Sequence, residues 1–354
     1  QGAELLVNVV RRSDTSRVQT LTLSGYSYPG SRLLPSLKGE TSRRNAGGGW
    51  EASALLSLNQ DESGKGHLTR RAADGTLTDK ARVAVESPIS GIETRLAGDT
   101  MLAGGIARTN ASFTYQNYRT QETLAFIEGA LAGTQARARD GLKTNNAEIG
   151  GEWSRSSSAG LSTKLLLLAT RKTVESVSTS DSADGIVDYA GRNVADERIL
   201  RAVVGRAAAK RIAWEATAEL AYNALESSGD LKVDGTPIEL PNSNVSVQEW
   251  RAEASGKATL AASRTLSLEL TLGSEFSRLR QSNRTTDFDY STSFAFLKPR
   301  LAASWSPGPN NQLRLRLERE VGQLDFNDFA SSASLIDGTV SAGNLELRPQ
   351  TAWV

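Results

Sequence analysis

The chain has 354 residues, and its 41 lysines and arginines nearly balance its 40 aspartates and glutamates, giving a net charge of +1. This balance provides no general attraction to nucleic acid. Cysteine is absent, which excludes disulfide scaffolds, thiolate metal sites and cysteine nucleophiles. No apolar run reaches the roughly 18 residues of a membrane-spanning helix. A membrane β-barrel stays possible, because its strands alternate and need no such run.

The first half of the chain predicts strands, and the alternation is clearest in residues 47–60. Apolar residues at even positions from Trp50 to Leu58 alternate there with polar ones such as Glu51 and Ser53. The other strands that we expect here are 16–24, 33–42, 79–87, 90–98, 104–119 and 146–155. Residues 121–139, with Leu124, Phe126, Ile127 and several alanines, predict a short helix within a loop.

The second half alternates more strictly. In residues 211–223 one face holds Ile212, Trp214, Ala216, Ala218, Leu220 and Tyr222, and the other holds Arg211, Glu215, Thr217, Glu219 and Asn223. A period of two marks a strand with one apolar and one polar face. The same pattern predicts strands at 161–175, 198–206, 246–259, 264–279, 291–305 and 311–321. We expect about 12–14 strands in all.

The length of these segments separates two classes of β protein. The segments run about 9–13 residues, whereas soluble strands average about 5–6 and membrane-crossing strands need about 9–11. The connections are alternately short and long, which is typical of an outer-membrane barrel with tight turns on one rim and long loops on the other. The long ones are expected at about 176–196, 226–244, 281–289 and after Gly322. A soluble β-solenoid or sandwich is the competing interpretation.

Charges on the alternating strands fix which face meets lipid. A lysine or arginine on the lipid face costs about 2–4 kcal/mol at the bilayer midplane, so the charged positions should face the lumen. They are Glu215, Glu219, Arg251, Glu253, Lys257, Arg314, Arg316 and Glu318. Leu268→Arg should therefore impair membrane assembly far more than Glu269→Arg. Trp214 and Trp305 lie beside short connections, and Tyr222, Trp250 and Phe276 lie nearer long ones, as two aromatic girdles would require.

The sequence offers few candidates for chemistry. Gly47-Gly48-Gly49 lacks the ending of a phosphate loop and predicts a turn before a strand. His67 lies in a turn-like polar stretch, where a solvated histidine is the expectation. Asp181, Asp184 and Asp188 lack the spacing of a calcium loop, and these three residues, like Asp325 and Asp328, are expected to be solvated acids. We therefore expect no enzyme, no catalytic, metal or cofactor residues, and an unassigned substrate site.

Two motifs resemble one family. Residues 2–12, with Gly2, the run Val7-Asn8-Val9-Val10 and Arg12, resemble the last plug strand of TonB-dependent outer-membrane receptors. Residues 343–351 resemble a Gly-Asn-Pro-x-Leu-x-Pro-Glu stretch of the family's barrel. The match keeps Gly343, Asn344, Leu347 and Pro349, and departs at Leu345 and Gln350.

The resemblance implies residues 1–14 as the end of a plug and residues 15–354 as part of a 22-stranded antiparallel transmembrane barrel. It implies nutrient uptake across the outer membrane of a Gram-negative bacterium, with a ferric siderophore, haem, cobalamin or an oligosaccharide as substrate. The implied partners are membrane lipid and the TonB–ExbB–ExbD complex, which would act through an N-terminal part absent from this sequence. We expect the sequence to be a segment of a longer protein, and its open edges to be completed by the rest of that protein or by another chain.

The sequence leaves other classes open. A passive porin or a barrel assembly factor would share the strands but lack the plug. A soluble β-rich binding or adhesion protein would bury its leucines in a dry interior. Burial of Leu266, Leu268, Leu270 and Leu313 there would exclude the transporter.

Overall fold

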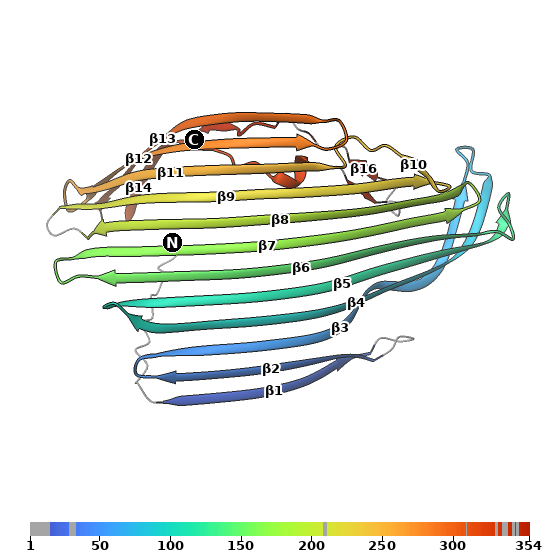
Figure 1. Ribbon diagram of the computed structural model, residues 1–354, viewed down its shortest axis with the longest axis horizontal. Coiled ribbons are helices and arrows are strands. Elements are labelled where there is room, and N and C mark those ends of the chain that lie inside the picture. Colours follow the sequence, from blue (N-terminus) through green and yellow to red (C-terminus); the bar gives the residue numbers. More distant parts are fainter. Residues whose placement is uncertain are drawn as a thin grey trace.

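The computed structural model describes residues 15–27, 33–207, 211–308, 310–329, 332–334, 339–341, 344 and 347–354. Nearly all of them belong to one curved antiparallel sheet (Figure 1). Residues 1–14, which include the expected plug strand, lie outside the described part. Among the described residues, no helix has the length and apolar character needed to cross a membrane.

The sheet follows the chain, with each strand hydrogen-bonded to its neighbour in sequence. Its first half consists of β1 (Ser16–Tyr26), β2 (Leu34–Asn45), β3 (Gly48–Arg71), β4 (Leu77–Leu102), β5 (Gly105–Gly129), β6 (Gln135–Ser156), β7 (Leu161–Ser182) and β8 (Gly185–Arg206). The second half consists of β9 (Ile212–Val233), the short β10 (Thr236–Ile238), β11 (Val245–Ala261), β12 (Leu266–Asn283), β13 (Phe288–Gly308), β14 (Asn311–Val321) and β17 (Thr351–Trp353). A separate pair, β15 (Ser332–Ser334) and β16 (Thr339–Ser341), and the 3₁₀ helix η1 (Phe326–Phe329) complete the elements.

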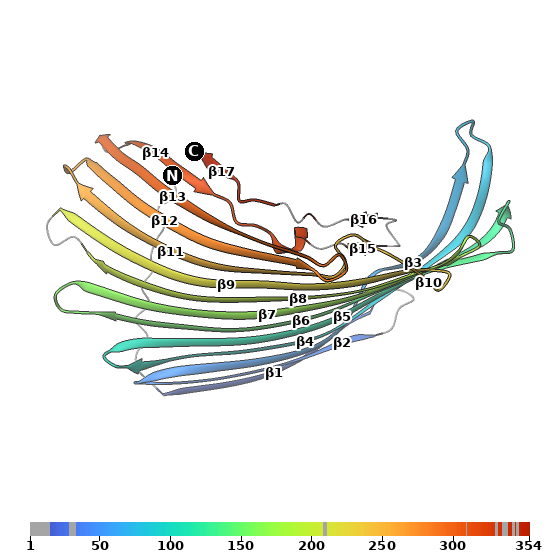
Figure 2. The same cartoon turned by 45° about the horizontal axis from the view of Figure 1, so that its top comes forward.

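The expected all-β antiparallel architecture is confirmed. Thirteen long strands, β1–β9 and β11–β14, form the main path. The order runs from β1 at one end to β17 at the other, so the described strands form an open sheet. Figure 2 shows the sheet bent into a trough, with η1 inside its concavity.

The predicted alternation of an apolar and a polar face is confirmed along β9. In β9 the apolar set from Ile212 to Leu220 lies on the convex face and is exposed at every second position, while Glu219 is buried on the concave face. Leu268, Leu270 and Leu313 are likewise exposed and Leu266 is half-buried. None of these four leucines lies in a dry core, so the leucine arrangement expected of a soluble core is excluded.

Strand length is the main correction. Ten strands, β3–β9 and β11–β13, have 17–26 residues instead of the expected 9–13. The expected loop at 176–196 is mostly strand, with only residues 183–184 between β7 and β8. Its Ser and Thr residues make both faces polar, so alternation of hydrophobicity gives no signal there.

Four further expectations also change. Residues 79–87 and 90–98 form the single strand β4, and 121–139 form the end of β5, a turn and the start of β6 instead of a helix. The long connections expected at 226–244 and 281–289 are also shortened, because β9, β12 and β13 extend into them. One rim therefore carries tight turns and the other carries extended hairpins, most visibly β3–β4 and β5–β6 (Figure 2).

Candidate functional site: the concave face

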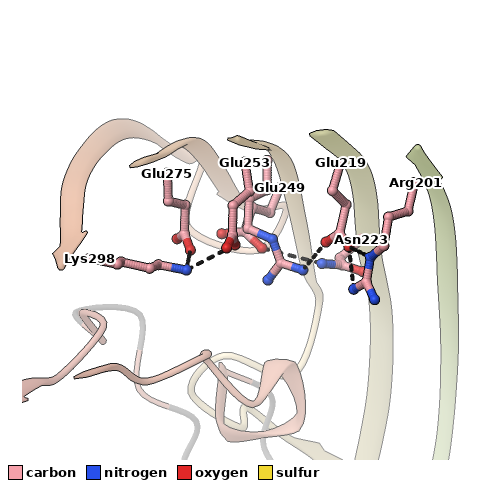
Figure 3. Close-up of polar contacts among 8 residues, drawn as sticks. Arg201, Glu219, Asn223, Glu249, Glu253, Glu275 and Lys298 are labelled. Atoms are coloured by element: carbon pink, nitrogen blue, oxygen red, sulfur yellow. Dashed lines mark hydrogen bonds and ion pairs between the residues drawn. The ribbon is translucent and has the colours of Figure 1, made fainter. Parts of the chain in front are cut away.

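The concave face carries a ladder of ion pairs across neighbouring strands (Figure 3). Glu219 on β9 accepts hydrogen bonds from Arg201 on β8, with Nε 2.6 Å from Oε2, and from Arg251 on β11, at 3.2 Å. The side chains of Glu219 and Arg251 are only 8% and 9% exposed. Beside them, Asn223 donates to Glu249 over 3.3 Å. A buried charge is costly without a partner, so this alternation of sign keeps the ladder stable.

A second cluster continues the ladder across β11–β13. The Lys298 ammonium lies 2.9 Å from a carboxylate oxygen of Glu253 and 2.5 Å from one of Glu275. One cation is therefore shared by two acids from different strands, as Figure 3 shows. This arrangement ties three adjacent strands together at one height.

The ladder ends on β13 and β14. Arg300 lies 3.6 Å from both Glu269 and Glu318, and Arg316 also pairs with Glu318. Of the predicted lumen-facing charges, seven form ion pairs on this face: Glu215, Glu219, Arg251, Glu253, Lys257, Arg316 and Glu318. Arg314 is exposed. Arg201, Lys298 and Arg300 were not predicted, although extending the same parity along β8 and β13 would have found them.

The other half of the concave face forms a shallow groove of about 810 Å³ across β1–β8. Its charged lining pairs Arg44 with Asp99 at 2.9 Å and Arg108 with Glu152 at 3.0 Å. Leu166, Leu168 and Ile199 supply an apolar strip beside these pairs. The groove could therefore hold a segment or ligand that combines polar and apolar groups.

An apolar cluster interrupts the polar character of the concave face. Leu225, Val245, Val247 and Leu279 are buried with Phe329 of η1, and Leu324, Phe326 and Leu347 pack around them. We call residues 322–350 the strap, because they leave the sheet at β14 and return to it at β17, where Gly322 N–H donates to the Gln350 carbonyl at 2.8 Å. Leu324, Phe326, Phe329 and Leu347 of the strap therefore pack on the concave wall at this cluster. The expected long loop after Gly322 is confirmed.

Two polar atoms beside this cluster have no hydrogen-bond partner among the described residues. They are Ser277 Oγ and Gln281 Oε1, on either side of Leu279 along β12. Ser277 and Gln281 are 0% and 1% exposed. Alternation along β12 places both on the concave wall, where such atoms are available to a group that enters from that side.

The residues that the sequence analysis weighed as candidates for chemistry do not gather in one place. His67 is exposed within β3 instead of a turn. The turn predicted at Gly47-Gly48-Gly49 lies at Ala46 and Gly47, and Gly48 and Gly49 are already the first residues of β3. Asp181 and Asp188 lie on β7 and β8, where Asp188 accepts from Thr179 over 2.8 Å. Asp184 is in the turn between them, and Asp325 and Asp328 lie at η1. In the described part of the chain, no three His, Cys, Asp or Glu residues gather into a metal site.

Both faces of the sheet change character at one row of residues. Arg198, Tyr222, Trp250 and Arg278 are direct neighbours across β8, β9, β11 and β12 on the convex face. On the turn side of this row the convex face is apolar and the concave face is charged. On the hairpin side the convex face is polar and the concave face holds the apolar cluster. The row therefore marks a boundary between two environments.

Comparisons with known proteins give matches among solved structures. No family model matches the sequence. No curated protein matches it either. A solved structure that is similar is the ferric yersiniabactin uptake receptor FyuA from Yersinia pestis, with a TM-score of 0.47 and 12% identity, over 88% of this chain and 48% of that one. The chain thus spans about half the length of that receptor.

Proposed function

We propose that this chain forms part of the wall of a TonB-dependent receptor in the outer membrane of a Gram-negative bacterium, and that the receptor imports a scarce nutrient without covalent chemistry. The observation that carries the proposal is the polarity of the sheet. Exposed leucines occupy the convex face, whereas paired and partly buried charges occupy the concave face.

The height of the apolar face supports a bilayer as its surroundings. On β9 it runs from Ile212 to Tyr222, ten steps along the strand. At about 3.4 Å per residue the band is about 34 Å long, and a strand tilt of about 45° reduces its height to about 24 Å. Transmembrane barrels present an apolar band about 25 Å tall.

The concave face suits a hydrated path or a bound plug. Ion pairs such as Lys298 with Glu253 and Glu275 hold strands together, and groups exposed beside them can bind a polar segment. Import would draw energy from the TonB–ExbB–ExbD complex. The substrate class is a ferric siderophore, haem, cobalamin or an oligosaccharide.

The test is growth of cells that express the complete protein, with each substrate class in turn as the sole limiting source, with and without TonB. We expect growth on one class that requires TonB, and a protein that needs detergent for extraction and shifts its migration in SDS on heating. Uptake that continues without TonB would indicate a passive porin. Solubility without detergent would indicate a β-rich binding or adhesion protein.

A further inference from the structure

The boundary row on the convex face carries two arginines around an aromatic pair. The Arg198 guanidinium lies over the Tyr222 ring, 5.8 Å from its centroid, and the Tyr222 and Trp250 rings are 4.8 Å apart. Arg278 is the register neighbour of Trp250 on the far side. Since adjacent strands are about 4.8 Å apart, three strand spacings separate the two arginines by about 14 Å.

These two arginines keep their charge available. Neither Arg198 nor Arg278 forms an ion pair with any residue that the structure describes, and Arg278 only donates to the Ser291 hydroxyl at 3.3 Å. The next row differs, because its arginines are neutralised by neighbours. Arg171 pairs with Asp196 and Arg280 with Asp289.

A broad apolar groove lies directly beside the boundary row, toward the turn rim. Its volume is about 900 Å³, and small residues form its floor, including Ala202, Ala218 and Ala254. The larger side chains of Leu200 and Phe276 line the groove beside these alanines. A second hollow of about 530 Å³ reaches from Leu200 up to Arg198, Tyr222 and Trp250. The apolar groove therefore continues into the cationic row.

We propose that this surface binds a membrane glycolipid with two phosphates on its sugar headgroup, each phosphate facing one arginine and the acyl chains lying in the alanine-floored groove. The proposal rests on the proposed function, since it needs the convex face to be in a membrane. Exposed arginines at a membrane border attract anionic headgroups, and arginine binds phosphate oxygens through paired N–H groups.

The spacing favours a glycolipid over a phospholipid. A headgroup with one phosphate can neutralise only one of two cations that are about 14 Å apart. The aromatic pair between them, with Trp250 63% exposed, offers a flat apolar surface on which sugar rings can stack. The groove spans strands β8–β13, so it is wide enough for several chains side by side.

The experiment measures binding of bis-phosphorylated lipid A, monophosphorylated lipid A and phosphatidylglycerol to the complete purified protein by native mass spectrometry. We expect bis-phosphorylated lipid A to bind most tightly. The double variant Arg198→Gln/Arg278→Gln should weaken its binding about 100-fold, about tenfold for each charged contact. Ala218→Leu/Ala254→Leu fills the groove and should also weaken binding.

Arg206→Gln is the matched control. Arg206 is exposed on the same face, beside Trp214 at the opposite border of the apolar band, and its loss should leave lipid A binding unchanged. Equal binding of phosphatidylglycerol, or unchanged lipid A binding in the double arginine variant, would overturn the proposal. Heat-dependent migration of each variant is a separate readout, because a wild-type protein that fails to insert would refute the proposed function itself.

Discussion

The polarity of the two faces predicts opposite outcomes for the same substitution at adjacent residues. Ala218 lies on the convex face of β9 and Thr217 lies on the concave face. Ala218 is six steps from Ile212, which is about 20 Å along the strand and about 14 Å up a band about 24 Å tall. In the proposed membrane Ala218 would therefore lie close to the midplane, where an arginine costs about 2–4 kcal/mol.

Thr217→Arg places the same charge between Glu215 and Glu219 on the concave face, where water and carboxylates can receive it. We therefore expect Ala218→Arg to lower the equilibrium constant for folding into lipid vesicles by about 30- to 900-fold, since about 1.4 kcal/mol is a factor of ten. Thr217→Arg should change it by less than about threefold. Denaturant titration of folding, followed by heat-dependent migration in SDS, measures both.

Position along the strand provides the internal control. Ile212 is at the edge of the apolar band, so Ile212→Arg should cost only about 0–1 kcal/mol. Leu268 is the register neighbour of Leu260, which itself faces Ile212, so Leu268→Arg belongs to the same edge class and is a weaker probe than Ala218→Arg. Equal costs at Ala218 and Thr217, or a larger cost at Thr217, would refute the assignment of faces.

Three further predictions concern the concave side. Glu219→Ala leaves buried Arg251 without that partner and should cost about 3–5 kcal/mol in unfolding free energy, measured by denaturant titration. Phe329→Ala removes a fully buried ring from the strap cluster and should accelerate protease cleavage within the strap while leaving the strands protected. Gly191→Ala would bring a Cβ to 2.5 Å from the Tyr189 hydroxyl and should lower the melting temperature, with a smaller loss in a Tyr189→Phe background.

The sequence was sufficient to predict the strand segments with one apolar and one polar face, and insufficient where both faces are polar. Alternation in 211–223 predicts β9 correctly because one face of the strand is apolar there and the other is polar. The strand continues to Val233 through a stretch that is polar on both faces, where the period disappears although the hydrogen bonds continue. The helix predicted at 121–139 was wrong for a related reason, because the apolar residues there do not keep to one face of the strands.

The apolar cluster could not be predicted from any single strand. Leu225 and Val247 occupy concave positions, so they look like errors in an otherwise polar register. They become part of a buried cluster only through contact with Phe329, which is more than 80 residues later in the chain. A signal did exist, because out-of-phase apolar residues on β9, β11 and β12 fall at the same height, but only the cross-strand register reveals it.

The boundary row, where both faces of the sheet change polarity, explains why the apolar cluster is needed on the concave side. In the proposed receptor, lipid would cover the convex face below the row of Tyr222 and Trp250, and the concave side could stay wet and charged. Above that row the same proposal places the convex face in water, so lipid would no longer contribute burial there. An isolated two-sided polar sheet is marginal in water, and a hydrophobic face must be covered by another element. Leu225, Val247 and Phe329 of the strap supply that layer on the concave side, which in the proposed receptor would extend the rigid wall beyond the membrane.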